Sequence, residues 1–174
     1  MGEMMTKPKL ATVWLGGCSG CHMSFLDLDE RLLDLAAHIE LCYSPIADAK
    51  EFPENVDIAL VEGALVNHDH IEEIRKIRER TKILVAFGDC AVTGNVAAMR
   101  NPIPLAEVVR TAYGDVKPGP ELPVLLERAE PLHSEVLIDH YLPGCPPPAQ
   151  RIFDLVVHLL EGSAPHEDGM KRFG

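Results

Sequence analysis

The chain contains no apolar run long enough to span a membrane and no excess of basic residues. Its longest apolar stretches, such as 155–160, are far shorter than the roughly 18 residues that a transmembrane helix needs. Its 16 Lys and Arg residues stand against 27 Asp and Glu, a formal net charge of −11. Because phosphate binding needs clustered cations, we expect no nucleic-acid partner. No convincing cleavage site follows the short apolar run at 10–17, so we expect a cytoplasmic protein without a membrane partner.

Repeats and low-complexity blocks are also missing from the sequence. The content of 47% apolar and 25% charged residues is ordinary for a globular domain and excludes a disordered chain. A length of 174 residues predicts a single domain over 1–174, with a core at 8–161 and a polar tail at 162–174.

The apolar patterns alternate between strand and helix. Short apolar runs predict strands at 9–15, 39–43, 57–62, 82–87 and 139–142. Apolar residues spaced three and four apart predict helices at 24–39, 70–80, 91–100, 104–113 and 149–161, the first with Ser24 as its N-cap. The proline-rich stretch 114–136 predicts a long connection or an insertion with a short helix. This alternation indicates an α/β fold, doubly wound around a mostly parallel sheet of the flavodoxin type.

Four of the five cysteines follow predicted strands. Cys18 and Cys21 follow the first strand, Cys90 the fourth and Cys145 the last. Because the carboxyl ends of parallel strands share one edge of a sheet, these thiols are expected to meet there. Cys42 lies within a predicted strand, which is typical of core packing.

Several chemistries suit four convergent thiols. One close Cys-x-x-Cys pair and two lone cysteines favour an iron–sulfur cluster, whereas most four-cysteine zinc sites use two close pairs. A redox dithiol at Cys18 and Cys21 would leave the other two cysteines unexplained. Glycines beside each site allow the backbone N–H groups to approach an anionic centre: Gly16, Gly17, Gly20, Gly88, Gly94 and Gly144.

Four motifs occur in a specific order along the chain. They read WLGGCSGCHMS at 14–24, VEG at 61–63, GDCA at 88–91 and LPGCPP at 142–147. Over residues 8–161 the sequence resembles the small subunits of nickel–iron hydrogenases and the related 20 kDa subunit of respiratory complex I. The complex I subunit has two adjacent cysteines where this chain has Cys18-x-x-Cys21, which favours the hydrogenase side.

The details favour one branch of that family. Membrane-bound and periplasmic small subunits carry a twin-arginine signal and a further cluster-binding domain, and neither is found in these residues. The compact form resembles the small subunit of cytoplasmic, bidirectional NAD-reducing hydrogenases. Such a subunit relays electrons between H2 and a diaphorase module that reduces NAD+. The resemblance implies as partners a nickel–iron large subunit and diaphorase, NADH-dehydrogenase-like iron–sulfur and flavin subunits.

The resemblance also assigns residues. It implies one 4Fe-4S cluster, proximal to the nickel–iron centre, with Cys18, Cys21, Cys90 and Cys145 as ligands. The chain is not catalytic alone, because a nickel–iron site needs two Cys-x-x-Cys pairs and this chain has one. Glu62, in the VEG motif, is either a helix-capping or interface carboxylate or, as a hypothesis, a proton relay.

Other assignments stay open at this stage. The chain is alternatively a 20 kDa-type subunit of a complex I-like or other cytoplasmic hydrogenase complex, or a zinc-stabilised structural adaptor. A flavin module is disfavoured because no Ser/Thr-rich phosphate loop follows the first strand. The sequence gives no support for FMN, and whether a flavin binds beside the cluster stays open. His22, next to Cys21, is a further candidate for tuning the cluster.

Overall fold

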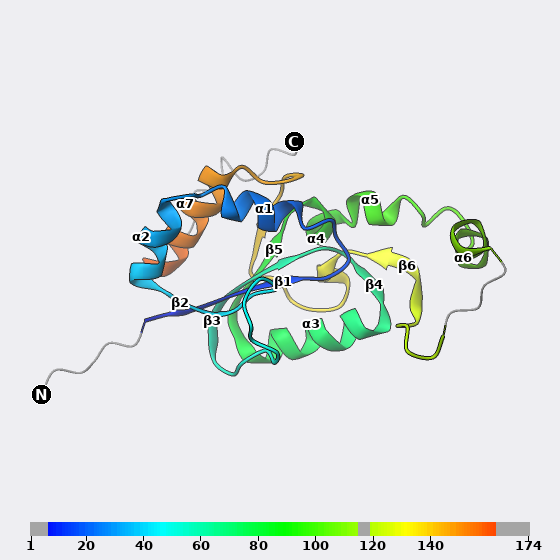
Figure 1. Cartoon of the computed structure of the whole chain (residues 1–174), viewed down its shortest axis with the longest axis horizontal. Coiled ribbons are helices and arrows are strands. Elements are labelled where there is room, and N and C mark those ends of the chain that lie inside the picture. Colours follow the sequence, from blue (N-terminus) through cyan, green and yellow to red (C-terminus); the bar gives the residue numbers. More distant parts are fainter. Residues whose placement is uncertain (1–6, 115–118, 163–174) are drawn as a thin grey trace, which may run out of the picture.

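A five-stranded parallel sheet forms the centre of the molecule (Figure 1). The computed structural model describes residues 7–114 and 119–162. The sheet order is β2-β1-β3-β5-β7. The strands are β1 Lys9–Trp14, β2 Glu40–Tyr43, β3 Val56–Glu62, β5 Thr81–Phe87 and β7 His140–Leu142. The second strand in sequence pairs outside the first, and the later strands follow on the other side. This is the flavodoxin-like order, so the predicted fold class is confirmed.

Helices cover both faces of the sheet. One face carries α1 Gly20–Leu26, α2 Arg31–His38 and α7 Ala149–Leu160, and the other carries α3 His68–Arg80 (Figure 1). The short α4 Asp89–Thr93 follows β5, and its Ala91 packs into the layer of α3. Alternate residues of each strand enter opposite layers: Leu10 pairs with Ile58 on the first face, and Ala11 pairs with Ala59 on the second. Burial on both faces explains why these strands are almost wholly apolar.

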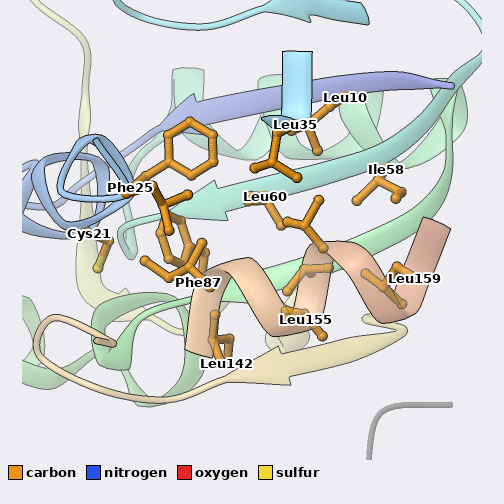
Figure 2. Packing of buried hydrophobic residues seen from close by; sticks show 14 of the residues in the cluster. Leu10, Cys21, Phe25, Leu35, Ile58, Leu60, Phe87, Leu142, Leu155 and Leu159 are labelled. Carbon is orange, nitrogen blue, oxygen red and sulfur yellow. The ribbon is translucent and has the colours of Figure 1, made fainter. Parts of the chain in front are cut away.

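The first layer ends at the cysteine edge of the sheet. Figure 2 shows Leu10, Ile58 and Leu60 in its interior, with Cys21 at one end of the cluster near Phe87. Cys21, in the first turn of α1, therefore belongs both to the hydrophobic core and to the cysteine edge of the sheet. No helix among residues 7–114 and 119–162 is long and apolar enough to cross a bilayer.

Two predicted helices are each divided in the structure. The helix expected at 24–39 is α1 followed by α2, separated by a turn in which Asp29 has φ 50°. Buried Leu28 lies in this turn, so the apolar spacing continues although the helix does not. Ser24 is not an N-cap: it lies inside α1, where its hydroxyl donates to Pro147 O at 2.6 Å.

The helix expected at 91–100 is also wrong in its limits. The chain forms α4 and then α5 Asn95–Ala98, because Gly94 at φ 84° turns the backbone between them. A Cβ on Gly94 would lie 2.9 Å from Ala98 Cβ, so the turn needs glycine for two reasons.

A second, two-stranded sheet was missed by the sequence analysis. Within 114–136, β6 Leu125–Glu130 pairs antiparallel with β4 Leu65–Asn67, and a short 3-10 helix, Leu132–Ser134, follows. β6 is mostly exposed and lacks a clear alternation of apolar residues, which hid it. Before it, α6 Leu105–Tyr113 stands apart from the main sheet and has no buried residue (Figure 1). The predicted tail lies outside the described residues except for Gly162.

The amino ends of the strands are joined by two carboxylates. Asp57 accepts the backbone N–H of Lys9 at 2.7 Å and pairs with Lys82 Nζ at 2.6 Å. Asp139 accepts the N–H of Leu84 at 2.7 Å and pairs with Arg78 at 2.6 Å. These contacts connect neighbouring strands at the edge opposite the cysteines.

Candidate metal centre

Three segments that follow strands at the carboxyl edge of the sheet carry the four predicted ligands. Cys21 and Cys90 lie in the first turns of α1 and α4, whereas Cys18 and Cys145 lie in loops. Cys18 and Cys21 follow β1, Cys90 follows β5 and Cys145 follows β7. Cys21 is buried and Cys90 is half-buried, whereas Cys18 and Cys145 are exposed. The fold thus places thiols that are up to 127 residues apart (145 − 18) at one rim, with a buried inner side and an exposed outer side.

The four thiols are near enough to influence each other's ionisation. Burial raises the pKa of Cys21, and the charges of Glu62, Cys90, Cys18 and Cys145 raise it further. Burial likewise raises the pKa of Cys90, with Cys145 and Cys18 adding to the effect. Four thiolates in this place need a positive group to hold them, because each disfavours the charge on the next.

Backbone groups also point at this rim. A backbone hydrogen bond from Val96, at the start of α5, stabilises the charged form of Cys90 and acts against the other causes of its raised pKa. Gly94, with φ 84°, makes the turn that precedes Val96. Such amides are the groups that adjust the charge and potential of an iron–sulfur centre.

Gly88 makes room for Cys21. Its φ is 85°, and a Cβ at this position would lie 2.2 Å from Cys21 Sγ. The N–H of Gly88 donates to Leu142 O at 2.8 Å, so the end of β5 is also tied to β7. The close approach of the Cys90 loop to Cys21 therefore depends on the absence of a side chain.

Glu62 and His22 form a buried pair beside Cys21. Glu62 ends β3, and its Oε2 lies 2.5 Å from His22 Nδ1 and accepts the His22 backbone N–H at 3.0 Å. The exposed fractions are 2% for Glu62 and 4% for His22. The bond to a free N–H in the first turn of α1 is the helix-capping contact expected as one role of Glu62. His22 Nε2 is buried and has no hydrogen-bond partner among residues 7–114 and 119–162.

The pairing of His22 with Glu62 was not predicted, although each residue was singled out. The two are 40 residues apart, and only the β1–β3 pairing, with Trp14 opposite Glu62, brings their segments together. Cys42 is separate from this site. It lies half-buried in β2 and donates to Leu10 O at 3.3 Å, which confirms a packing role.

The donor set has the chemistry that an iron–sulfur cluster requires. Four cysteine thiols, glycine-lined loops and inward amides fit an anionic cluster with thiolate ligands. Within the described ranges, no three His, Cys, Asp or Glu side chains are arranged to hold a metal ion. The fit to a cluster rests on the chemistry of the four thiols and on the edge of the sheet that they share.

Residues 18–159 match the family model for the 20 kDa subunit of NADH ubiquinone oxidoreductase. The chain belongs to this family. The match contains all four rim cysteines and every strand after β1. The predicted resemblance to this family is thereby confirmed.

Several hydrogenase subunits are similar to this chain. The delta subunit of the NAD-reducing hydrogenase HoxS of Cupriavidus necator is 39% identical over 167 residues, covering 90% of this chain and 80% of that protein. The F420-non-reducing hydrogenase vhu of Methanocaldococcus jannaschii has a subunit that is 38% identical over 166 residues, covering 90% of this chain. The chain covers 57% of the length of this second relative.

Solved structures agree with the fold. A chain from a NAD+-reducing NiFe hydrogenase in the H2-reduced state superposes with a TM-score of 0.88 and 42% identity, covering 97% of this chain and 99% of that one. A chain of the Ni-Fe-Se hydrogenase of Desulfomicrobium baculatum shares the fold at a TM-score of 0.61 and 19% identity, covering 95% of this chain and 69% of that one.

Proposed function

We propose that this chain is the electron-transfer small subunit of a nickel–iron hydrogenase and that it holds one 4Fe-4S cluster. Cys18, Cys21, Cys90 and Cys145 would be the ligands. The observation that carries the proposal is the gathering of these thiols at one edge of the sheet. It is supported by the 42% sequence identity to a chain of a NAD+-reducing NiFe hydrogenase with the same fold.

The residues around the thiols suit electron relay. Such a cluster accepts and releases one electron at a time. Cys21 fixes the inner side in the hydrophobic core, where water is excluded, and Val96 directs an N–H to Cys90. Cys18 and Cys145 hold the outer, exposed side. A site with one buried and one exposed side gives electrons a short route to a partner that covers the rim.

The partner that covers the rim is, in this proposal, the nickel–iron large subunit. Large apolar side chains are exposed beside the cysteine loops, on the end of β1, on α1 and along α5: Trp14, Met23, Val96 and Met99. Exposed apolar groups of this size are typical of a protein interface. H2 would be split in the large subunit, because the single Cys-x-x-Cys pair of this chain is used for the cluster.

Electrons would leave toward a diaphorase module that reduces NAD+. The similarity to NAD-reducing hydrogenases supports this acceptor. The comparable identity to a subunit of an F420-non-reducing hydrogenase supports a second candidate, in which the same relay serves another acceptor module. In either case residues 8–161 act as one domain.

Purification of the native complex tests the proposal. We expect a broad brown absorption, about four irons and as much sulfide for each copy of this chain, and H2-dependent reduction of NAD+. Stoichiometric zinc without sulfide would contradict the cluster. Iron and sulfide with H2-dependent reduction of a viologen dye, but none of NAD+, would favour the second candidate.

A further inference from the structure

Asp89 joins two of the cysteine loops directly. Its carboxylate Oδ1 accepts the backbone N–H of Gly144 at 2.7 Å, and its own backbone N–H donates to Gly144 O at 2.9 Å. Asp89 precedes Cys90, and Gly144 precedes Cys145. This reciprocal pair of bonds, which we call the Asp89 clamp, connects positions one residue away from each cysteine.

A second contact ties the Cys145 loop to the Cys18–Cys21 segment. The buried hydroxyl of Ser24 donates to Pro147 O at 2.6 Å, which links α1 to the residues after Cys145. Together with the Asp89 clamp, this bond ties the loop after β7 both to the residues that precede Cys90 and to α1. None of these bonds involves a cysteine sulfur.

The same kind of bond occurs where no cysteine is present. Asp57 and Asp139 each accept a backbone N–H across strands at 2.7 Å, at the amino edge of the sheet. A carboxylate that accepts a strand or loop N–H is therefore a recurrent means of joining segments in this fold. Among the described residues, the bond from Gly144 N–H to the Asp89 carboxylate is the only one of this kind that joins two of the segments that carry the proposed ligands.

We propose that Asp89 is a positioning residue, which fixes the Cys90 and Cys145 thiols relative to each other before any metal is bound. The carboxylate acts through its hydrogen bond to Gly144 and touches neither sulfur in this role. A preset separation lowers the conformational cost of cluster assembly and keeps the ligands in place when the cluster changes charge. The positioning of the two thiols by Asp89 does not depend on the proposed function. The effect of this positioning on a cluster rests on the proposed function.

Three variants of the full chain separate positioning from general stability. Asp89→Ala removes the acceptor, and Asp89→Asn keeps an acceptor oxygen for Gly144 N–H. Asp139→Ala is the matched control, because it removes the same type of bond at the opposite edge. The first measurement is the yield of a Cys90–Cys145 cross-link made by a short bifunctional maleimide in metal-free protein, located by peptide mass spectrometry.

We expect Asp89→Ala to lose most of this cross-link, and Asp89→Asn and Asp139→Ala to keep it. Equal yields in wild type and Asp89→Ala, or equal losses in Asp89→Ala and Asp139→Ala, would overturn the proposal. Loss in Asp89→Asn as large as in Asp89→Ala would overturn it too, since charge rather than the hydrogen bond would then matter.

The second measurement uses the purified complex. Substitution of groups that orient metal ligands typically costs about 10- to 100-fold in metal affinity, so iron release to a chelator should accelerate by a similar factor in Asp89→Ala. Asp139→Ala should release iron at the wild-type rate. If the wild-type complex contains no iron and sulfide, the proposed function fails, while the cross-linking result still decides the role of Asp89.

Discussion

Cys21 Sγ occupies the space that a side chain on Gly88 would need. A Cβ on Gly88 would lie 2.2 Å from this sulfur, and the Gly88 backbone has a φ of 85°. The buried Cys21 thiol and the residues that lead into α4 and Cys90 are thus in direct contact. Since nothing larger than glycine fits, the contact can be tested by adding one methyl group.

Gly88→Ala should displace Cys21 and abolish cluster retention. Gly114→Ala is the matched control, because Gly114 also has a positive φ, of 65°, but among the described residues no atom beyond its chain neighbours lies within 4 Å of an added Cβ. The control should lose only roughly 1–3 kcal/mol of folding stability, from the backbone strain of a non-glycine residue at positive φ. It should keep its iron. Iron and sulfide analysis with thermal melting measures both effects. A Gly88→Ala protein with full iron content would contradict the contact.

Cys90→Ser should loosen the cluster and stop electron flow to NAD+, because it removes one of four proposed thiolate ligands. Cys42→Ser should leave both nearly unchanged, since a hydroxyl can still donate to Leu10 O. Iron content and H2-dependent NAD+ reduction of the purified complexes are the measurements. Equal damage from the two substitutions would refute the ligand assignment.

Met99→Glu should weaken association with the large subunit. Met99 follows α5 beside the cysteine loops and is 73% exposed, and a carboxylate buried there at an apolar interface would be unpaired. Leu33→Glu is the control, because Leu33 is 74% exposed but lies on α2, away from the α5 end of the molecule (Figure 1). Co-purification of the two subunits measures the effect. Equal yields for the two variants would show that this surface is not the interface.

Asp139 should make folding stability sensitive to acid. Partial burial opposes its ionisation, but hydrogen bonds from Leu84 N–H and Arg78, with the Arg78 charge, outweigh this and lower the pKa of Asp139. The stabilisation is therefore complete above the unfolded pKa of about 4 and is lost as the pH falls through the folded value.

Urea unfolding of wild type and Asp139→Asn between neutral pH and about pH 3 tests this. Wild type should be more stable by a constant margin from neutral pH to about pH 5, and the margin should shrink at lower pH. A margin that already shrinks above about pH 5 would assign the effect to another group.

The sequence predicted the sheet well because its strands are buried on both faces. Runs such as 82–87 are almost wholly apolar, and the structure places them in β5 with all neighbours parallel. The strand β6 was missed because it is mostly exposed and has no continuous apolar run. Its partner β4 also lies some 60 residues earlier (125 − 65 = 60), so the pairing leaves no local pattern in the sequence. The divided helices depended on single backbone turns, at Asp29 and Gly94, which apolar spacing does not report.

The candidate site was predictable as a set of cysteines but not as a network. The positions of the four thiols follow from where strands end. The bonds of Asp89, Ser24 and Glu62 cross 55, 123 and 40 residues of sequence, and only the strand order decides which loops become neighbours. Asp89 stood in the GDCA motif without a role, and Ser24 was mistaken for a cap.

The sheet keeps its two tasks at opposite ends of the strands. Ion pairs of Asp57 and Asp139 fasten the amino ends, and the cysteine loops occupy the carboxyl ends. The ion pairs can therefore be redesigned to strengthen the protein without altering the segments that carry the proposed cluster ligands.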